Sequence, residues 1–239
     1  MVVSYDRLSR TAQSLGMACR GGFHPVPEDG VPQTADGRPT GTLILLGFTD
    51  GRQWPAFVAS PEYRDGEPHP LDRWSRRITA GLARQFAADE LYPTGPPWWP
   101  FQRWAQRAEA LHLSPLGILI HPEFGLWHAY RGALAFAARF AVPVPRPWPH
   151  PCERCEDRPC LSRCPADAIA WGKFNRAGCV AYVESPAGSD CRANGCLARR
   201  SCPVGATHRY GAGQAAFHME ATLAAARSRK RPADRADLR

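Results

Sequence analysis

The sequence predicts a mixed α+β protein in which an N-terminal α/β layer domain is followed by a smaller cysteine-rich module. Three observations support this: apolar segments with strand and helix periodicities alternate up to about residue 141, a proline-rich stretch follows, and eight of the nine cysteines lie between residues 152 and 202. We therefore expect a domain at 1–141, a stiff linker at 142–150, a module at 151–212, and a C-terminal helix with a mobile charged tail at 213–239.

Hydrophobic patterning defines the elements of the first domain. Residues 42–48 form an unbroken apolar run, which is typical of a buried strand. Residues 71–86 carry large apolar side chains every four positions and predict an amphipathic helix. The prolines of segment 55–63 favour a surface loop. Further predicted elements are a short helix within 4–20, a helix over 102–111, and strands over 117–121 and 126–136.

Composition sets the class of protein. The chain has 239 residues and 44% hydrophobic content, with a mean hydropathy of -0.38. No apolar run approaches the ~20 residues that span a bilayer, so we expect a globular protein without a membrane span. The N-terminus lacks the basic and apolar regions of a secretory signal, and a cytoplasmic location is therefore expected. Thiols stay reduced in that compartment, which favours metal ligation over disulfides.

The net charge of +8 and the pI of 9.2 raise nucleic acid as a partner. The basic residues are nearly all arginines, however, and the lysines are Lys173 and Lys230. Two cubane clusters, each carrying about -2 with four thiolates, would lower the net charge to about +4. The charge balance therefore disfavours nucleic acid as the partner.

The cysteine spacing carries the chemistry. Cys152, Cys155, Cys160 and Cys164 are separated by two, four and three residues, and Pro165 follows. The middle gap is two residues longer than in the bacterial ferredoxin run. In such a run, three thiolates from one tight loop cap three irons of a cubane, and the fourth cysteine begins a helix that leads to the neighbouring cluster.

We therefore predict a ferredoxin-like module with two [4Fe-4S] clusters. Each cluster takes four cysteine thiolates, and the eight clustered cysteines make two such sets. The first set is Cys152, Cys155, Cys160 and Cys202, and the second is Cys164, Cys179, Cys191 and Cys196. Zinc is the alternative, because one Cys-x2-Cys pair is present. The ninth cysteine, Cys19, stands apart and is expected to be a small buried hydrophobe.

Arginines surround these predicted ligands. Near a cluster they would favour the electron-rich state or dock an acidic partner, and the alternative is a solvated surface. They are Arg154, Arg158, Arg163, Arg176, Arg192, Arg199 and Arg200.

Three stretches carry a family resemblance. Residues 117–127, 160–169 and 175–182 resemble segments of the epoxyqueuosine reductases and, more distantly, of the reductive dehalogenases. The resemblance implies two [4Fe-4S] clusters, supports Cys179 as a ligand, and implies cobalamin as a further cofactor between an α/β domain and the cluster module. The N-terminal half contains no match to the catalytic acid of that family.

The same resemblance suggests a cofactor wall. Residues 124–130 resemble one side of the corrinoid site, and two histidines flank the turn before them. The candidate cofactor-binding residues are His121, Phe124, Trp127, His128 and Tyr130. A structural role is the alternative for each histidine. No set of residues forms a credible Ser, His and Asp catalytic group.

The predicted function is an iron–sulfur redox protein. It would pass electrons from a donor protein of the flavodoxin or ferredoxin type to a cofactor or substrate on the N-terminal domain, as a corrinoid-dependent reductase would. One alternative is a ferredoxin-type carrier or partner subunit without its own catalysis. Another is a zinc-stabilised interaction module.

Overall fold

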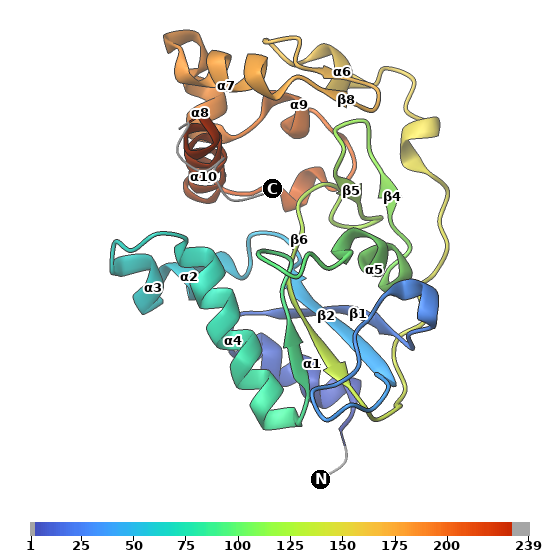
Figure 1. Cartoon of the computed structure of the whole chain (residues 1–239). Coiled ribbons are helices and arrows are strands. Elements are labelled where there is room, and N and C mark those ends of the chain that lie inside the picture. Colours follow the sequence, from blue (N-terminus) through green and yellow to red (C-terminus); the bar gives the residue numbers. More distant parts are fainter. Residues whose placement is uncertain (1–2, 231–239) are drawn as a thin grey trace, which may run out of the picture. The chain divides into compact units, whose positions relative to one another are not determined.

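The computed structural model describes residues 3–230, and these residues form two compact units (Figure 1). Unit 1 holds residues 3–112 and 127–149, and unit 2 holds residues 113–126 and 150–230. The prediction of a mixed α+β fold is confirmed, since a four-stranded sheet occurs together with ten α-helices in the described part of the chain. The charged tail predicted within 231–239 lies outside the described residues.

Unit 1 is organised around one antiparallel sheet with strand order β1-β2-β6-β3. The strands are β1 (Ala18–Phe23), β2 (Thr42–Phe48), β6 (Ala129–Phe136) and β3 (Asp89–Leu91). The strand predicted at residues 42–48 is confirmed as β2, and all seven of its residues are buried. Because every pair in the sheet is antiparallel, this unit is an α+β layer and the expected α/β layer is wrong. Alternation of strands and helices along a sequence does not fix strand direction.

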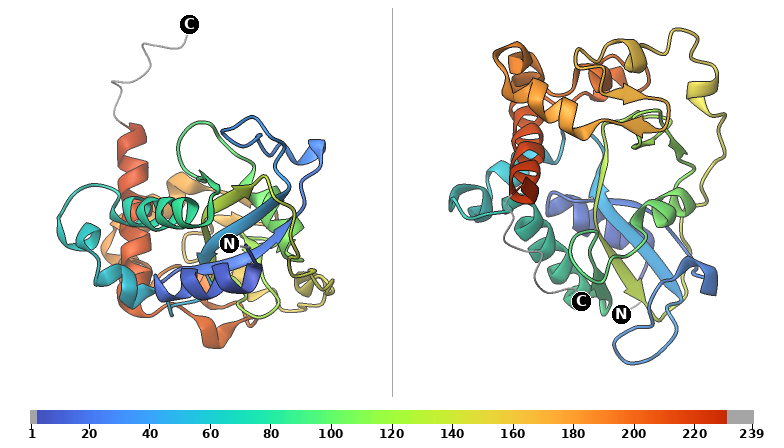
Figure 2. Two further views of the ribbon diagram at one scale, coloured as in Figure 1. Left: turned by 90° about the horizontal axis from the view of Figure 1, so that it is seen from below. Right: turned by 45° about the horizontal axis from the view of Figure 1, so that its top comes forward.

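Three helices cover this sheet, and the views in Figure 2 show them around it. They are α1 (Tyr5–Ser14), α4 (Pro70–Phe86) and α5 (Phe101–Ala108). The amphipathic helix predicted over 71–86 is confirmed as α4. Its four-residue stripe of Trp74, Ile78, Leu82 and Phe86 is buried, as a core-facing stripe should be.

The loop predicted for residues 55–63 is wrong. This segment instead contains parts of two short helices, α2 (Trp54–Val58) and α3 (Pro61–Arg64). Each proline lies in the first turn of its helix, where no intrahelical partner for its nitrogen is needed and the fixed φ suits the helix. Ser60 caps α3 by accepting a hydrogen bond from the Tyr63 amide.

The proline-rich segment 142–149 contains no helix or strand. It is attached to unit 1 near its end, because the Trp148 indole donates a hydrogen bond to the carbonyl of Ala110. The carbonyl of Trp148 lies 2.8 Å from Nε2 of His112, and the two rings are 5.2 Å apart. These contacts hold the end of the proline-rich segment against the rest of unit 1.

Unit 2 consists of short elements and one long helix. A two-stranded sheet joins β4 (His112–Leu113) and β5 (Leu119–Ile120), and a hairpin joins β7 (Ile169–Ala170) and β8 (Lys173–Phe174). The helices are α6 (Pro159–Ser162), α7 (Arg176–Glu184), α8 (Ser189–Asn194), α9 (Leu197–Arg200) and α10 (Ala212–Lys230). No helix in residues 3–230 is long and apolar enough to cross a membrane.

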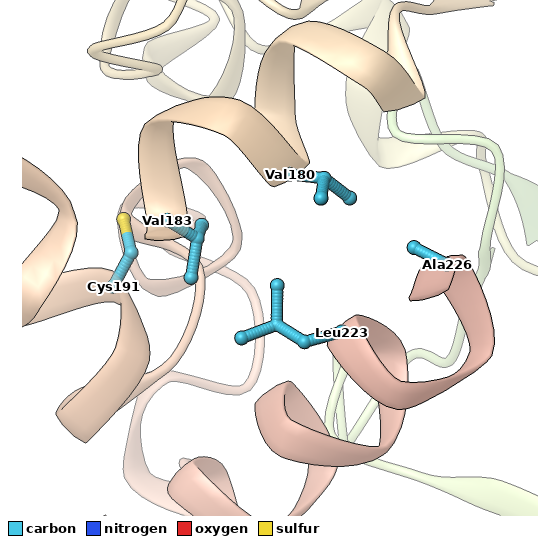
Figure 3. Close-up of a cluster of buried hydrophobic side chains, with 5 residues drawn as sticks. All are labelled: Val180, Val183, Cys191, Leu223 and Ala226. Atoms are coloured by element: carbon cyan, nitrogen blue, oxygen red, sulfur yellow. The ribbon is translucent and has the colours of Figure 1, made fainter. Parts of the chain in front are cut away.

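Helix α10 is anchored by an apolar core. Leu223 and Ala226 of α10 lie against Val180 and Val183 of α7 and Cys191 of α8 (Figure 3). All five side chains are buried, and Leu223 is only 1% exposed. The C-terminal helix therefore holds together the two helices that carry Cys179 and Cys191.

Segment 113–126 belongs with the cysteine-rich part of the chain. Gly125 has a left-handed backbone, and a Cβ placed there would lie 2.0 Å from the carbonyl oxygen of Val204. Glycine at this position therefore allows the turn after β5 to approach the chain directly after Cys202. The ring of Phe124 also meets the ring of His208 edge-on, with centroids 5.1 Å apart.

Candidate functional site

Four cysteines line one pocket in unit 2. Cys152, Cys155, Cys160 and Cys202 surround a space of about 190 Å³. Three of these thiols are buried, and Cys155 is half-buried. Ile120 and Val204 contribute apolar wall, whereas Arg154 and Arg158 contribute the charged side chains. Cys202 reaches this pocket although 41 residues separate it from Cys160 in the sequence.

Local geometry turns these thiols toward one another. Cys152 lies in a short 3-10 helix (η2, Pro151–Glu153), and its amide donates to Nδ1 of His150 at 3.3 Å. Cys160 lies in the first turn of α6, directly after Pro159. Arg158 has a left-handed backbone, φ 39°, which reverses the chain between the two cysteines.

The electrostatics of this first group favour a bound cation. The pKa of Cys152 is raised to about 11, chiefly by burial and then by Cys202, Cys160 and Cys155, while Arg158 acts in the opposite direction. Burial also raises the pKa of Cys160 and that of Cys202. Thiolates at Cys152, Cys160 and Cys202 would repel one another, so these three thiols stay protonated unless positive charge is bound among them.

The other four clustered cysteines form a second group. Cys164 shares an apolar core with Cys179 and Cys196, and Cys191 shares the neighbouring core with Cys179. The pKa of Cys179 is raised to about 11, first by burial and then by Cys196, Cys164 and Cys191. Burial is also the main cause of the raised pKa of Cys196.

Each thiol of the second group comes from a different element. Cys179 is on α7, Cys191 is on α8, and Cys196 is the N-cap of α9. Cys164 was expected to begin a helix, but residues 164–167 form a turn in which the Asp167 amide donates to the Cys164 carbonyl at 3.1 Å. That expectation is wrong because Asp167 has a left-handed backbone, φ 45°, which leads the chain into β7 instead.

The described residues contain no group of three or more His, Cys, Asp or Glu arranged to hold a single metal ion.

The arginines around the cysteines have several different partners. Arg158 acts on Cys152, and Arg209 acts on Cys202. Arg192 donates to the carbonyl of Val183 at 2.9 Å. Further along, Arg199 donates to the carbonyl of Leu126, and Arg200 pairs with Asp190. The last three arginines therefore hold elements of unit 2 together.

The candidate cofactor residues His121 and Phe124 lie in unit 2. Nδ1 of His121 accepts hydrogen bonds from the amides of Glu123 at 3.0 Å and Phe124 at 3.1 Å. The ring stacks on Phe124 with centroids 4.6 Å apart. Since Nδ1 accepts, the ring proton is on Nε2. These bonds give His121 a structural role in the turn that ends at Gly125.

The other three candidates lie in unit 1. Trp127 is buried at 2% exposure. His128 and Tyr130 belong to a polar group that the sequence did not predict. It is centred on the buried Arg20, and Glu109, His128 and Tyr130 are half-buried. Arg20 is the single charged residue within the apolar segment 17–23, and this could have predicted the group. A charge is rarely buried in a strand without a partner, so a buried acidic partner would be expected.

The Arg20–Glu109 pair has defined geometry. Arg20 is 1% exposed, and its guanidinium donates to the two carboxylate oxygens of Glu109 at 3.1 and 2.7 Å. The Tyr130 hydroxyl donates to the same carboxylate, and its ring lies 4.9 Å from the guanidinium carbon. Nη2 of Arg20 is 3.4 Å from Nδ1 of His128. Burial raises the pKa of Tyr130 well above its ordinary value, so this hydroxyl remains a donor.

Comparisons with known proteins show similarity at the level of fold. No family model matches the sequence, and no curated protein matches it. The structure is similar to the C. elegans B12-trafficking protein CblC, a homologue of human MMACHC. The TM-score is 0.53 at 14% identity, and the match covers 91% of this chain and 95% of that one.

Epoxyqueuosine reductases also match, with lower scores. The Streptococcus thermophilus enzyme gives a TM-score of 0.46 at 15% identity, covering 86% of this chain and 67% of the enzyme. A reductase solved with an epoxyqueuosine-modified tRNA-Tyr stem loop gives 0.46 at 12% identity, covering 86% of this chain and 66% of that one. The chain thus spans about two thirds of the length of these reductases. The likeness to CblC, with a TM-score above 0.5, indicates a shared fold.

Proposed function

We propose that this protein is an iron–sulfur redox protein with two [4Fe-4S] clusters. Cys152, Cys155, Cys160 and Cys202 would hold the first cluster. The second would be held by Cys164, Cys179, Cys191 and Cys196. The observation that supports this most directly is that eight cysteines gather into two separate groups of four, each with the ligand number of one cubane.

The chemistry of the donor set fits this cofactor. The thiols are at least half-buried, and burial raises the pKa of five of them. Bound iron would compensate the charge of the deprotonated sulfurs, so cluster binding should release protons and stabilise unit 2. When bound, such clusters supply one-electron transfer. The residues of this chain hold the sulfurs in place and exclude water from them.

The electrons would pass to a cofactor or substrate on the N-terminal domain, which we propose to be a corrinoid. Two observations support this: the fold resembles that of a B12-trafficking protein, and sequence segments resemble the corrinoid-dependent epoxyqueuosine reductases. The residues proposed for contact with the cofactor remain His121, Phe124, Trp127, His128 and Tyr130. The alternative is a ferredoxin-type carrier or partner subunit without its own catalysis.

Iron analysis of anaerobically prepared protein tests the cluster proposal. About eight irons per chain, with broad absorbance in the blue part of the visible spectrum, is the expected result for two cubanes. Cys160→Ser and Cys191→Ser should each disturb one cluster and retain the absorbance of the other. Cys19→Ala is the matched control, because Cys19 lies in unit 1, and it should retain all the iron. Zinc without iron in the wild-type protein would support the zinc-stabilised module instead.

Titration with cobalamin separates the reductase from the carrier. A ligand that binds the folded protein raises its thermal midpoint by mass action. We expect the corrin spectrum and the thermal midpoint both to change on addition of cobalamin to the iron-loaded protein. If neither changes, the corrinoid part of the proposal is wrong, and the carrier function remains.

A further inference from the structure

The hairpin β7–β8 exposes two large aromatic side chains. Trp171 is 50% exposed and Phe174 is 54% exposed. The hairpin turns at Gly172, and Ala170 pairs with Lys173 beside the turn. Large aromatic groups gain much from burial, so two of them exposed on one short hairpin indicate a surface that another molecule covers.

The base of this hairpin reaches the second cysteine group. Ile169, the first residue of β7, is 9% exposed. It lies in one apolar core with Cys164 and Ala168, against which Cys179 and Cys196 also pack. The backbone that carries the exposed aromatic residues therefore begins beside these thiols.

The tip of the hairpin reaches the first cysteine group through Arg158. The guanidinium carbon of Arg158 lies 4.9 Å from the centroid of the Trp171 ring. Arg158 also lines the pocket formed by the first four thiols and acts electrostatically on Cys152. Trp171 is thus separated from the first thiol group by a single side chain.

The charge of the hairpin is positive. The hairpin, residues 169–174, contains Lys173 and no aspartate or glutamate, and Arg158 lies against its tip; the exposed acids near it are Glu156, Asp157 and Asp167. Both Lys173 and Arg158 are exposed, so their charges are available to a partner. An aromatic pair with positive charges around it is complementary to an acidic surface with an apolar centre.

We infer that this hairpin, with Trp171, Lys173, Phe174 and Arg158, is the docking surface for an acidic one-electron donor protein of the flavodoxin or ferredoxin type. This rests on the proposed function, because it assigns the entry point for electrons to the proposed clusters. In each transfer, the reduced donor loses one electron and the centre among the cysteines gains it. No bond is made or broken, and no proton needs to move. Surface aromatic residues supply affinity, and the positive charges accelerate encounter.

The test compares hairpin variants with matched controls on unit 1. Trp171→Ala is paired with Trp98→Ala, since Trp98 is also exposed, at 76%. Lys173→Glu is paired with Arg64→Glu, because Arg64 is an exposed cation at the end of α3. Iron content and thermal midpoint should equal the wild-type values in all four variants, because these side chains are exposed.

Two readouts are measured with a purified acidic flavodoxin in its hydroquinone form as the probe. The first is the dissociation constant of the whole chain for the flavodoxin at low salt, and the second is the rate at which the visible absorbance is bleached. Trp171→Ala should weaken binding about tenfold, as loss of an aromatic anchor does. Lys173→Glu should slow bleaching and reduce its dependence on salt. Dithionite should bleach every variant at the wild-type rate.

Equal binding of wild type and both hairpin variants would overturn the inference. Two other results would also overturn it: a single-stranded RNA oligomer that displaces the flavodoxin from this surface, or a dimer of this chain that Trp171→Ala dissociates. Failure of the proposed function would look different. In that case the wild-type protein would contain no iron and show no absorbance to bleach, whereas the binding measurement could still be made.

Discussion

The ion pair between the buried Arg20 and the half-buried Glu109 gives a prediction about the stability of unit 1. Glu109→Ala removes the carboxylate that accepts two hydrogen bonds from Arg20 and one from Tyr130. Arg20 is 1% exposed, so its charge loses its partner without gaining water. Breaking a fully buried pair costs about 3–5 kcal/mol. Because the Glu109 side chain is 18% exposed, we expect the unfolding free energy to fall by about 3 kcal/mol, the lower end of that range.

Tyr130→Phe and a double variant divide this loss of unfolding free energy among the individual contacts. Removing the hydroxyl that donates to the carboxylate should cost about 1.5–3 kcal/mol, the range for a hydrogen bond to a charged group. The double variant Arg20→Met with Glu109→Leu should cost much less than the sum of the single changes, since no unpaired charge remains buried. Glu28→Ala, which removes an exposed carboxylate, should change stability by less than about 0.5 kcal/mol.

Urea unfolding followed by tryptophan fluorescence is the assay, with hydrogen exchange of the β1 and β2 amides to isolate unit 1 from unit 2. The two units need not unfold together, so hydrogen exchange of the β1 and β2 amides is needed to give the unfolding free energy of unit 1 alone. If Glu109→Ala matches wild type within about 0.5 kcal/mol, the buried pair does not stabilise unit 1 and the reasoning fails.

Further predictions concern both units. Leu223→Ala should lower the unfolding free energy by about 2–5 kcal/mol, whereas Leu113→Ala, at a 52% exposed site, should change it little. Gly125→Ala should destabilise unit 2 in urea unfolding because its backbone is left-handed and a Cβ would meet a carbonyl oxygen; Gly211→Ala, which meets open space, should not. Burial raises the pKa of Cys19 from 9.0 to about 12. The unfolded thiol ionises first, so Cys19 should lower stability by about 1.4 kcal/mol per pH unit between pH 9 and 12, and Cys19→Ala should reduce the observed slope by that amount. Tyr130 and the buried cysteines of unit 2, whose pKa values are also raised, should contribute the rest of the slope.

Local patterns were sufficient to predict the elements with strong periodicity. Strand β2 is an unbroken apolar run, and α4 has an apolar stripe, so both could be found from neighbouring residues alone. Segment 55–63 was misread because proline at the start of a helix and proline in a loop look alike in sequence. Strand direction was also misjudged, since pairing between β2 and β6 depends on contacts distant in sequence.

The candidate site shows the same division between local and distant information. Cysteine spacing suggested two sets of four, and the assignment of these sets to clusters stays a prediction. Nothing in the spacing indicated that segment 113–126 lies in the same unit as the cysteines, because that depends on the approach of Gly125 to Val204. The partner of Arg20 is 89 residues away, so the sequence could reveal an unusual charge but not its counterpart.

The return of Cys202 to the pocket of Cys152, Cys155 and Cys160 has a consequence for biosynthesis. The chain between Cys160 and Cys202 is a closed loop that contains all four cysteines of the other group. During synthesis, the enclosed group is complete once Cys196 has emerged, while the enclosing group must wait for Cys202. Closing a loop costs less entropy when its interior is already folded. The inner thiols are therefore the first complete set of four to emerge, whereas α10, which packs against the helices that carry Cys179 and Cys191, emerges only after both sets.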